Sequence, residues 1–409
     1  MDRIIKVTGR EILNAKGKPT VEAKVFTESG IVTTASTPSG TSKGKYEAHE
    51  LYDGGTRYDG FGTKTACKLI NTEINDALYG VDVTDQKKID EIMIQLDGTP
   101  NKERLGGNAI IAVSMAAAKA GAKAQKKPLY TTLKEGTTPR LPDIIATVIS
   151  GGEYSPSGLE FEDYLYIFHG YESFSKMLED LTAARKRLEK ILKAEFGDFP
   201  EDGGALAPPV KTSEEAFDWM LRAAEEVGCR DHVTVGLDVA AGELYDESTG
   251  KYKAMGTMLT ADELTAHYLD LCAKYPLTYI EDPFDQDDFV SHAALKKLAP
   301  AGTQIIGDDL FVTNVSRLQT GIENDSATTL LLKVNQIGTV TEAIAANDMA
   351  LSAGMDVTVS MRSGDTPEDF ISDLAVAVNA RQIKLGSPVR AERTSKFNRL
   401  LEIEEELGE

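Results

Sequence analysis

Short apolar runs that stop abruptly at a charged residue are the dominant pattern in the second half of the chain. Six such runs are VTVGLD, PLTYIE, TQIIGD, TLLLK, VTVSMR and RQIK, and they end at Asp238, Glu281, Asp308, Lys333, Arg362 and Lys384. The spacing suits a strand plus its returning helix in a βα barrel, which takes about 250 residues for eight units. Because the C-terminal ends of barrel strands converge, we expect these six side chains at one mouth.

Residues 1–135 follow a different pattern. The segment VEAKVFTESGIVTTAS predicts a β-hairpin around the turn Glu28-Ser29-Gly30. Residues 37–55 form a long polar loop rich in Gly, Ser and Thr, which predicts a mobile lid or binding loop. Helical patterns follow, one of them starting from the N-cap residue Asp85, and another, GGNAIIAVSMAAAKAGAKA, apolar on most faces. We therefore predict an α/β protein with an α+β capping domain over 1–135 and a modified βα barrel over 136–409.

Composition narrows the classes of partner. The chain has 409 residues, of which 41% are hydrophobic, and a formal net charge of −21. That charge argues against nucleic acid or an anionic membrane as a partner. No apolar stretch approaches the roughly 18 residues of a membrane span, and the N-terminus lacks a signal-peptide pattern. We expect a cytoplasmic protein whose anionic substrate is held by local cations or metal ions.

Three carboxylates at strand ends indicate a metal site. Asp238, Glu281 and Asp308 would repel one another if crowded, and ligation by oxygen alone favours Mg²⁺ over Zn²⁺. The alternative is that they are separate N-caps of the following helices, but Glu is a poor N-cap. Asp282 and Asp309 follow two of them, and strand alternation allows only one residue of each pair to be a ligand.

Two further strand ends carry cations. Lys333 lies among apolar residues, where desolvation lowers the pKa of an amine and suits it to act as a base; the alternative is a lysine extending to the barrel rim. Arg362 and Ser363 offer a guanidinium fork and a hydroxyl for a phosphate or carboxylate. A helix-capping Ser beside a surface Arg would give the same local sequence.

Long motifs resemble those of the enolase (phosphopyruvate hydratase) family along nearly the whole chain. They include KGKPTVEAKV, PSGTSKGKYEAHEL, GGNAIIAVSMAAAKAGA, GLDVAAGELY, IEDPFDQDD, GDDLFVTN, LLKVNQIGTVTEAI and RSGDT. The resemblance implies a capping domain on an enolase-type barrel and a homodimer or homo-octamer. It also implies the glycolytic conversion of 2-phospho-D-glycerate, a small phosphorylated anion, to phosphoenolpyruvate.

The same resemblance implies roles for individual residues. It implies two Mg²⁺ ions, the second bound once substrate is present, and a lysine that removes the proton alpha to the substrate carboxylate. The matching positions are Asp238, Glu281 and Asp308 for the first Mg²⁺, Ser39 for the second, Lys333 for the base, Lys384 for the substrate carboxylate, and Arg362 and Ser363 for the phosphate.

Four departures from the family motifs concern the leaving-group side of that site. Tyr154 and Met361 stand where family members carry histidines. Asp163 and Asp202 stand where they carry glutamates, and one extra residue follows the glycines after Asp202. An error of about 1 Å in position can cost about 100-fold in rate, so a shorter acid matters. Asp202, Asp163 and the neighbouring Glu162 are the candidates for the general acid and its support, and Tyr154, Glu162 and Met361 for contacts to the substrate.

Three functional hypotheses follow. The first is a hydro-lyase that acts on 2-phospho-D-glycerate. The second is an enolase-like dehydratase for a different phosphorylated or phosphonylated hydroxy acid, of the carboxyphosphonoenolpyruvate synthase type. The third is a catalytically silent paralogue with a binding role, against which the retained lysines and carboxylates argue, because buried like charges are costly to keep.

Overall fold

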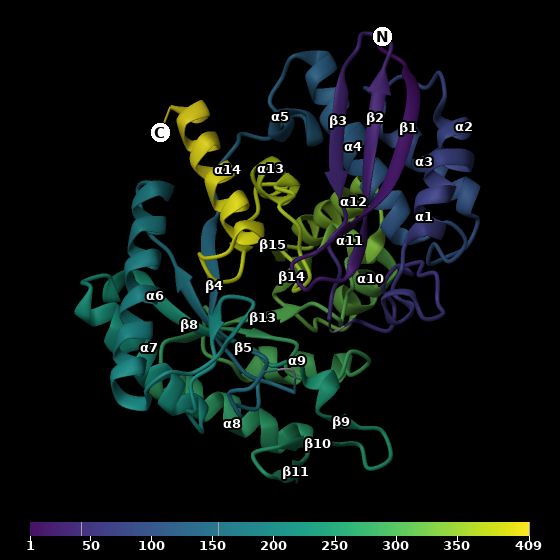
Figure 1. Cartoon of the computed structure of the whole chain (residues 1–409). Helices are drawn as coiled ribbons and strands as arrows, with labels where there is room; N and C mark the ends of the chain where they lie inside the picture. The colour runs from purple at the N-terminus through teal and green to yellow at the C-terminus, as the bar shows by residue number, and fades with distance from the viewer. Residues whose placement is uncertain (42, 154, 409) are drawn as a thin grey trace.

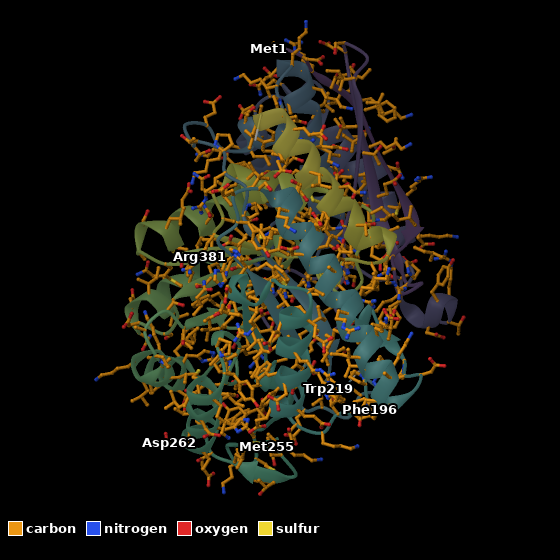
Figure 2. All side chains as sticks on the ribbon, turned by 90° about the vertical axis from the view of Figure 1, so that its left-hand side faces the viewer. Met1, Phe196, Trp219, Met255, Asp262 and Arg381 are labelled. Atoms are coloured by element: carbon orange, nitrogen blue, oxygen red, sulfur yellow. The ribbon has the colours of Figure 1, made fainter. Side chains whose placement is uncertain are left out.

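The computed structural model describes residues 1–41, 43–153 and 155–408. Figure 1 shows a small sheet with helices, formed by the first third of the chain, beside a barrel formed by the rest. The view in Figure 2 places Met1 at one end of the molecule and Met255 and Asp262 at the other.

The N-terminal sheet is antiparallel, in the order β1 (Ile4–Leu13), β2 (Pro19–Thr27), β3 (Val32–Ser36). The predicted hairpin is β2–β3, with Val25 opposite Thr33. Gly30 in its turn has φ 88°, a left-handed conformation that costs glycine little. Buried residues alternate along β2, and α4 (Gly107–Gln125) covers that face. The expected buried helix and hairpin thus pack against each other, and their buried residues continue into the main hydrophobic core.

Shorter helices complete this part. The carboxylate of Asp85 accepts a hydrogen bond from the backbone N–H of Lys88, so the expected N-cap is confirmed. In the described part of 37–55, the only regular pairing is an isolated antiparallel bridge between Ser39 and Gly364. The helical segments are η1 (Arg57–Gly60), α1 (Lys64–Leu69), the π-helical turn η2 (Ile70–Ile74), α2 (Asn75–Leu78), α3 (Gln86–Asp97) and α5 (Leu129–Leu133).

The barrel predicted from the apolar runs is confirmed. Each strand pairs with the next, and the last closes on the first. The ladders are parallel except those of the second strand, which runs antiparallel to both neighbours. Within the described ranges the eight barrel strands are β4 (Asp143–Ser150), β5 (Asp163–Phe168), β8 (Val233–Asp238), β12 (Leu277–Glu281), β13 (Gln304–Gly307), β14 (Thr329–Leu332), β15 (Asp356–Ser360) and β16 (Gln382–Lys384).

Helices alternate with the strands after an opening of two strands and two helices. Side chains from five strands form a separate buried cluster that fills the barrel interior: Ile145, Leu165, Ile167, Tyr279, Ile306 and Leu331. The helices are α6 (Phe174–Phe196), α7 (Ser213–Glu226), α8 (Ala261–Lys274), α9 (Phe289–Leu298), α10 (Val315–Glu323), α11 (Val334–Ile337), α12 (Val340–Ser352), α13 (Phe370–Ala377) and α14 (Ala391–Leu407).

Small additions decorate the barrel. β6 (Glu201–Asp202) and β7 (Ala205–Leu206) form a hairpin that joins β4, and β9 (Tyr245–Asp246), β10 (Lys251–Ala254) and β11 (Thr257–Leu259) form a separate sheet. Helices α6 and α7 pack together where the rings of Phe196 and Trp219 meet edge to face (Figure 2). Across the described ranges, no helix combines the length and apolar character needed to cross a membrane.

Candidate active site

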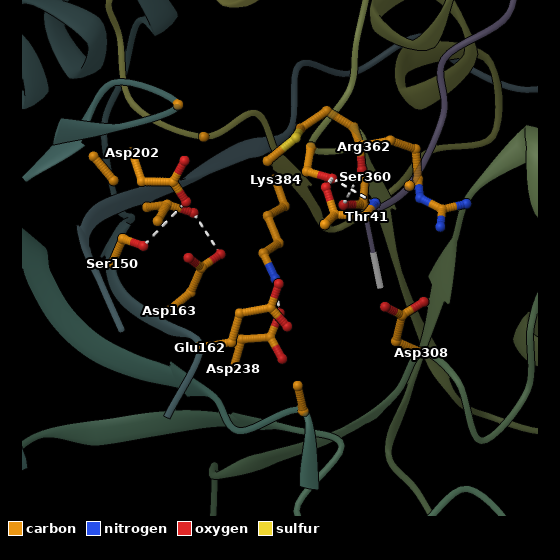
Figure 3. Close-up of a pocket in the computed structure, with 18 of the residues that line it drawn as sticks. Thr41, Ser150, Glu162, Asp163, Asp202, Asp238, Asp308, Ser360, Arg362 and Lys384 are labelled. Carbon is orange, nitrogen blue, oxygen red and sulfur yellow. Dashed lines mark hydrogen bonds and ion pairs between the residues drawn. The ribbon is translucent and has the colours of Figure 1, made fainter. Parts of the chain in front are cut away.

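The six charged residues do lie at one end of the barrel. Asp238, Glu281 and Lys384 are the last residues of β8, β12 and β16. Asp308 and Lys333 directly follow β13 and β14. The strands are in parallel register, with Asp238 opposite Glu281, so their ends meet around one pocket (Figure 3).

Lys384 is the centre of the first ion-pair group. Its Nζ donates to Asp238 Oδ2 and to Glu281 Oε2, both at 2.7 Å. The hydroxyl of Tyr279 donates to the same Glu281 oxygen at 2.7 Å. Burial alone would lower the pKa of Lys384, but the charges of Asp238 and Glu281 outweigh it and hold that pKa well above its usual value. Lys384 is therefore a fixed, protonated cation at this mouth.

Lys333 is paired with Asp308, and this pairing corrects one expectation. Its Nζ donates to Asp308 Oδ2, and Gln336 Nε2 donates to the other oxygen at 2.8 Å. Burial lowers the pKa of Lys333, as expected, but the charge of Asp308 outweighs that effect and the net pKa is raised. The expectation that Lys333 has a lowered pKa is therefore wrong, because it left out the charge of Asp308.

One buried carboxylate oxygen near Lys384 has no hydrogen-bond donor among the described residues, which favours a divalent cation at this site. Glu281 Oε1 is fully buried, and no described residue donates a hydrogen bond to it. Burial and the charge of Asp238 raise the pKa of Glu281 well above its usual value. A hard cation would satisfy the orphaned oxygen and offset the repulsion. The donor chemistry of Asp238, Glu281 and Asp308 therefore suits a hard cation, although Glu281 does not line the pocket and the three carboxylates are not among the described groups whose oxygens lie within 4.8 Å of one another.

A second acidic set shares Asp308 with the first. Carboxylate oxygens of Asp282, Asp308 and Asp309 lie within 4.8 Å of one another. The two oxygens of Asp282, however, already accept the backbone N–H groups of Asp308, at 2.9 Å, and Asp309, at 2.7 Å. Asp282 therefore holds the turn after β13 in place, which gives it a structural task that the other carboxylates lack.

Asp163 and Asp202 lie together on the opposite side of Lys384 from Asp308, while Glu162 lies beside Asp238 (Figure 3). Asp163 is the first residue of β5, and its Oδ2 accepts from Thr147 Oγ1 at 2.9 Å. Burial raises the pKa of Asp163 to about 6.

Asp202 lies in β6, with Oδ2 3.5 Å from Ser150 Oγ. Glu162 also lines the pocket, and burial followed by the charge of Asp238 raises its pKa well above the usual value. Tyr154, the remaining candidate on this side, lies outside the described residues.

The expected phosphate-binding pair is engaged by the N-terminal loop. Arg362 Nη1 and Nη2 donate to Glu47 Oε2 and Oε1 at 3.0 and 2.9 Å. Ser363 Oγ accepts from the backbone N–H of Thr41 at 2.9 Å and lies 2.9 Å from its hydroxyl. The sequence did not single out Glu47 or Thr41, because nothing in a polar loop signals which distant residue it will meet.

Ser39 and Met361 have partners of other kinds. Ser39 Oγ donates to Glu50 Oε2 at 3.0 Å, and the serine is not among the residues that line the pocket. Met361 lines the pocket, and its sulfur contacts a guanidinium nitrogen of Arg393 from α14. Arg393 was also missed, since an arginine in an amphipathic helix carries no signal of its own.

Comparisons with known proteins give a family match for each of the two parts of the chain. Residues 4–133 match the family model described as "Enolase, N-terminal domain", and residues 139–409 match "Enolase, C-terminal TIM barrel domain". The chain is 47% identical to an enolase of Methanopyrus kandleri over 100% of its own length and 97% of that protein. It is 44% identical to an enolase of Pyrococcus furiosus, with 99% and 95% covered.

The chain belongs to the enolase family. It is accordingly an enzyme of the lyase class with an enolase-type hydro-lyase function. Three of the four positions expected to differ from the family motifs, Asp163, Asp202 and Met361, line the same pocket as Lys333 and Lys384.

Proposed function

We propose that this enolase-family chain is a Mg²⁺-dependent hydro-lyase that converts 2-phospho-D-glycerate to phosphoenolpyruvate and water. The observation that carries the proposal is the pair of buried ammonium groups, Lys333 and Lys384, each ion-paired with a strand-end carboxylate in one pocket. Such an arrangement supplies a base and a fixed cation beside a metal-ligating set, which is what abstraction of a proton next to a carboxylate requires.

The base and the carboxylate site are proposed from the lysines. Lys333 takes the C2 proton as its neutral amine, while the ammonium of Lys384 holds a substrate carboxylate oxygen. Asp238, Glu281 and Asp308 would hold the first Mg²⁺, and Ser39 is proposed for the second, which requires its hydroxyl to leave Glu50. Bound Mg²⁺ would polarise the substrate carboxylate and offset the charge of Asp308, which otherwise raises the pKa of Lys333.

The leaving group departs on the side of the candidate acids. The C2 electron pair forms the C2–C3 double bond, the C3–O bond breaks, and a carboxylic acid gives its proton to the departing hydroxide, which leaves as water. A raised pKa, as burial gives Asp163 and Glu162, favours the protonated carboxyl that this step needs. Asp202 is the candidate acid and Asp163, with its pKa of about 6, its support. Glu162 is the third candidate, and Tyr154, Glu162 and Met361 are proposed substrate contacts. Arg362 and Ser363 are the proposed phosphate clamp.

One observation favours a second substrate class. Met361 replaces an expected histidine, and its sulfur meets the guanidinium of Arg393 at the pocket wall. A thioether cannot transfer a proton, so the acid side differs chemically while the base side does not. The second candidate is therefore the same elimination from another phosphorylated or phosphonylated hydroxy acid.

One experiment separates the candidates. Purified protein with Mg²⁺ is given 2-phospho-D-glycerate, and the ultraviolet absorbance of the phosphoenolpyruvate double bond is followed together with exchange of the C2 proton in D₂O. Fast product formation excludes the other substrate class and the silent paralogue. Exchange without product indicates an intact base with a mismatched acid side. If neither signal appears, the proposed substrate is wrong.

Location and assembly are also proposed. The family resemblance supports a cytoplasmic, glycolytic enzyme that forms a homodimer or homo-octamer. Light scattering of the purified chain at several concentrations tests the assembly, and a monomer at all of them would contradict it.

A further inference from the structure

Arg393 reaches from the first turn of α14 to the backbone of the proposed phosphate clamp. Its Nη1 donates to the carbonyl oxygen of Arg362 at 2.7 Å, and its Nη2 donates to that of Ser363 at 3.1 Å. The same Nη1 contacts the sulfur of Met361. One guanidinium therefore spans three consecutive residues that follow β15, and its side chain is only 3% exposed.

The cation is backed by a second one. Asp365 Oδ2 lies 3.5 Å from Arg393 Nη1 and 3.3 Å from Lys396 Nζ, and all three side chains are almost fully buried. The nearby carboxylate of Glu392 is paired with Arg390 instead. Among the described residues, Asp365 is the only carboxylate at ion-pair distance from either cation, and the charges of Glu392 and Asp163 act on Arg393 from farther away. Two cations that share one close carboxylate place positive charge behind the segment that carries Arg362 and Ser363. A buried charge of this kind acts through a low dielectric and is weakly screened by salt.

The fold makes room for this guanidinium. Gly386, two residues after Lys384, has φ 72°. A Cβ atom there would lie 3.2 Å from Arg393 Nε and 3.3 Å from Met361 Cε, closer than side chains normally pack. Arg393 Nε is buried, and no described residue accepts a hydrogen bond from it. An arginine that served packing alone would be expected to have its donors satisfied.

We propose that Arg393 is a positioning residue that holds the Arg362–Ser363 backbone and supplies positive charge behind it, and so determines affinity for the phosphoryl or phosphonyl group of the substrate. This inference rests on the proposed function of that segment. Arg393 is assigned a role in substrate binding and none in proton transfer. Its guanidinium contacts two backbone carbonyl groups and the sulfur of Met361, but neither Lys333 nor Lys384.

The test uses inorganic phosphate as the probe and the full-length protein with Mg²⁺. Isothermal titration compares the wild type with Arg393→Met, Arg393→Lys and the control Arg399→Met. Arg399 lies on the same helix, but it pairs with Asp373, Glu402 and Glu406 and does not line the pocket. We expect Arg393→Met to weaken phosphate binding by about 10- to 100-fold, because the Arg362–Ser363 backbone loses its support and the positive charge behind it. Arg393→Lys keeps the positive charge but loses the paired guanidinium donors, so it should recover part of the affinity for phosphate.

The kinetic signature adds a second readout. With any substrate that the enzyme converts, Arg393→Met should raise KM while kcat changes by less than about threefold. This is the pattern expected when a mutation removes substrate binding and leaves the chemical step intact. Equal weakening by Arg393→Met and Arg399→Met, or a fall in kcat at unchanged KM, would overturn the assignment. If Arg393→Met does not fold, the intermediate affinity expected of Arg393→Lys decides the matter, and wild-type affinity in that variant contradicts it.

The phosphate titration does not depend on catalytic turnover. If the wild type binds phosphate, loses it on Arg393→Met and yet fails to convert 2-phospho-D-glycerate, the proposed substrate fails and the role of Arg393 stands. If the wild type binds no phosphate, the role of Arg393 fails whatever the enzyme converts.

Discussion

Glu47 and Arg362, which are 315 residues apart in sequence, form a forked ion pair in which each carboxylate oxygen accepts one guanidinium N–H group. Their side chains are 6% and 4% exposed. The pair joins the long N-terminal loop to the barrel at the residue proposed to bind the phosphoryl group. The loop thus places an internal anion where the substrate is expected to place its own.

Glu47→Gln should tighten phosphate binding. The variant removes a negative charge that repels the incoming anion, and we expect an improvement of about three- to tenfold in the Kd of inorganic phosphate. The melting temperature without phosphate should fall, because Arg362 loses a buried partner. Titration calorimetry and thermal melts measure both. Asp53→Asn, on the same loop but with its carboxylate bonded to the backbone N–H groups of Lys64 and Thr65, is the control; weaker phosphate binding in Glu47→Gln alone would show that Glu47 helps rather than competes.

Lys333→Ala should abolish proton exchange at C2. A positioned general base contributes about 10² to 10⁴ in rate, so exchange into D₂O should fall at least to that extent. Proton NMR of the substrate measures the rate. Lys297→Ala, on the exposed end of α9, is the control and should exchange at the wild-type rate. Persistent exchange in Lys333→Ala would assign the base elsewhere.

The two acidic sets make opposite predictions for Mg²⁺. If Asp238, Glu281 and Asp308 are the ligands, Glu281→Gln should remove the rise in melting temperature that Mg²⁺ causes, and Asp309→Asn should keep it. Wild-type protein treated with a chelator should lose the same increment and regain it with added Mg²⁺. The reverse result, loss in Asp309→Asn and retention in Glu281→Gln, would assign the ion to Asp282, Asp308 and Asp309.

Asp163 should make the metal-free protein less stable as pH rises. Burial raises the pKa of Asp163 to about 6, above the value of about 3.9 in an unfolded chain. The native state then binds the proton more tightly, so the contribution of Asp163 to the free energy of unfolding falls between about pH 4 and pH 6 and stays lower above that range.

Asp163→Asn removes this penalty. In the presence of chelator the variant should be more stable than the wild type at pH 8 by about 1 to 3 kcal/mol, with the difference vanishing near pH 4. Urea denaturation at pH 4, 6 and 8 measures it. A difference that is the same at all three values would point to packing rather than to the titration of Asp163.

The sequence predicted the strand ends well because strands of a barrel are buried on both faces. Their continuous apolar runs stop where the chain reaches the mouth, so Asp238 and Lys384 could be placed without a structure. The hairpin and the N-cap at Asp85 were likewise local features with local signals.

What the sequence could not predict depends on partners far along the chain. The fork between Glu47 and Arg362 and the reach of Arg393 to Ser363 join segments with no shared local pattern. The pKa of Lys333 was misjudged for the same reason: its burial is visible in the sequence, while its pairing with Asp308 is not. β5 lies outside the six predicted strand ends, and its direction is set by its antiparallel pairing with β4 and β8.

The reversed direction of β5 has a consequence for how this site can change. In an ordinary βα unit, one strand end reaches the mouth and a helix must return before the next does. The β4–β5 hairpin instead brings Ser150 and Asp163 to the mouth at the two ends of a single loop. Among the described residues of that loop, no helix lies between those two strand ends, and buried Leu159 and Phe161 anchor the loop to the barrel, with the N–H groups of Gly151 and Gly152 bonded across it. A change within this one loop therefore alters two sides of the mouth at once.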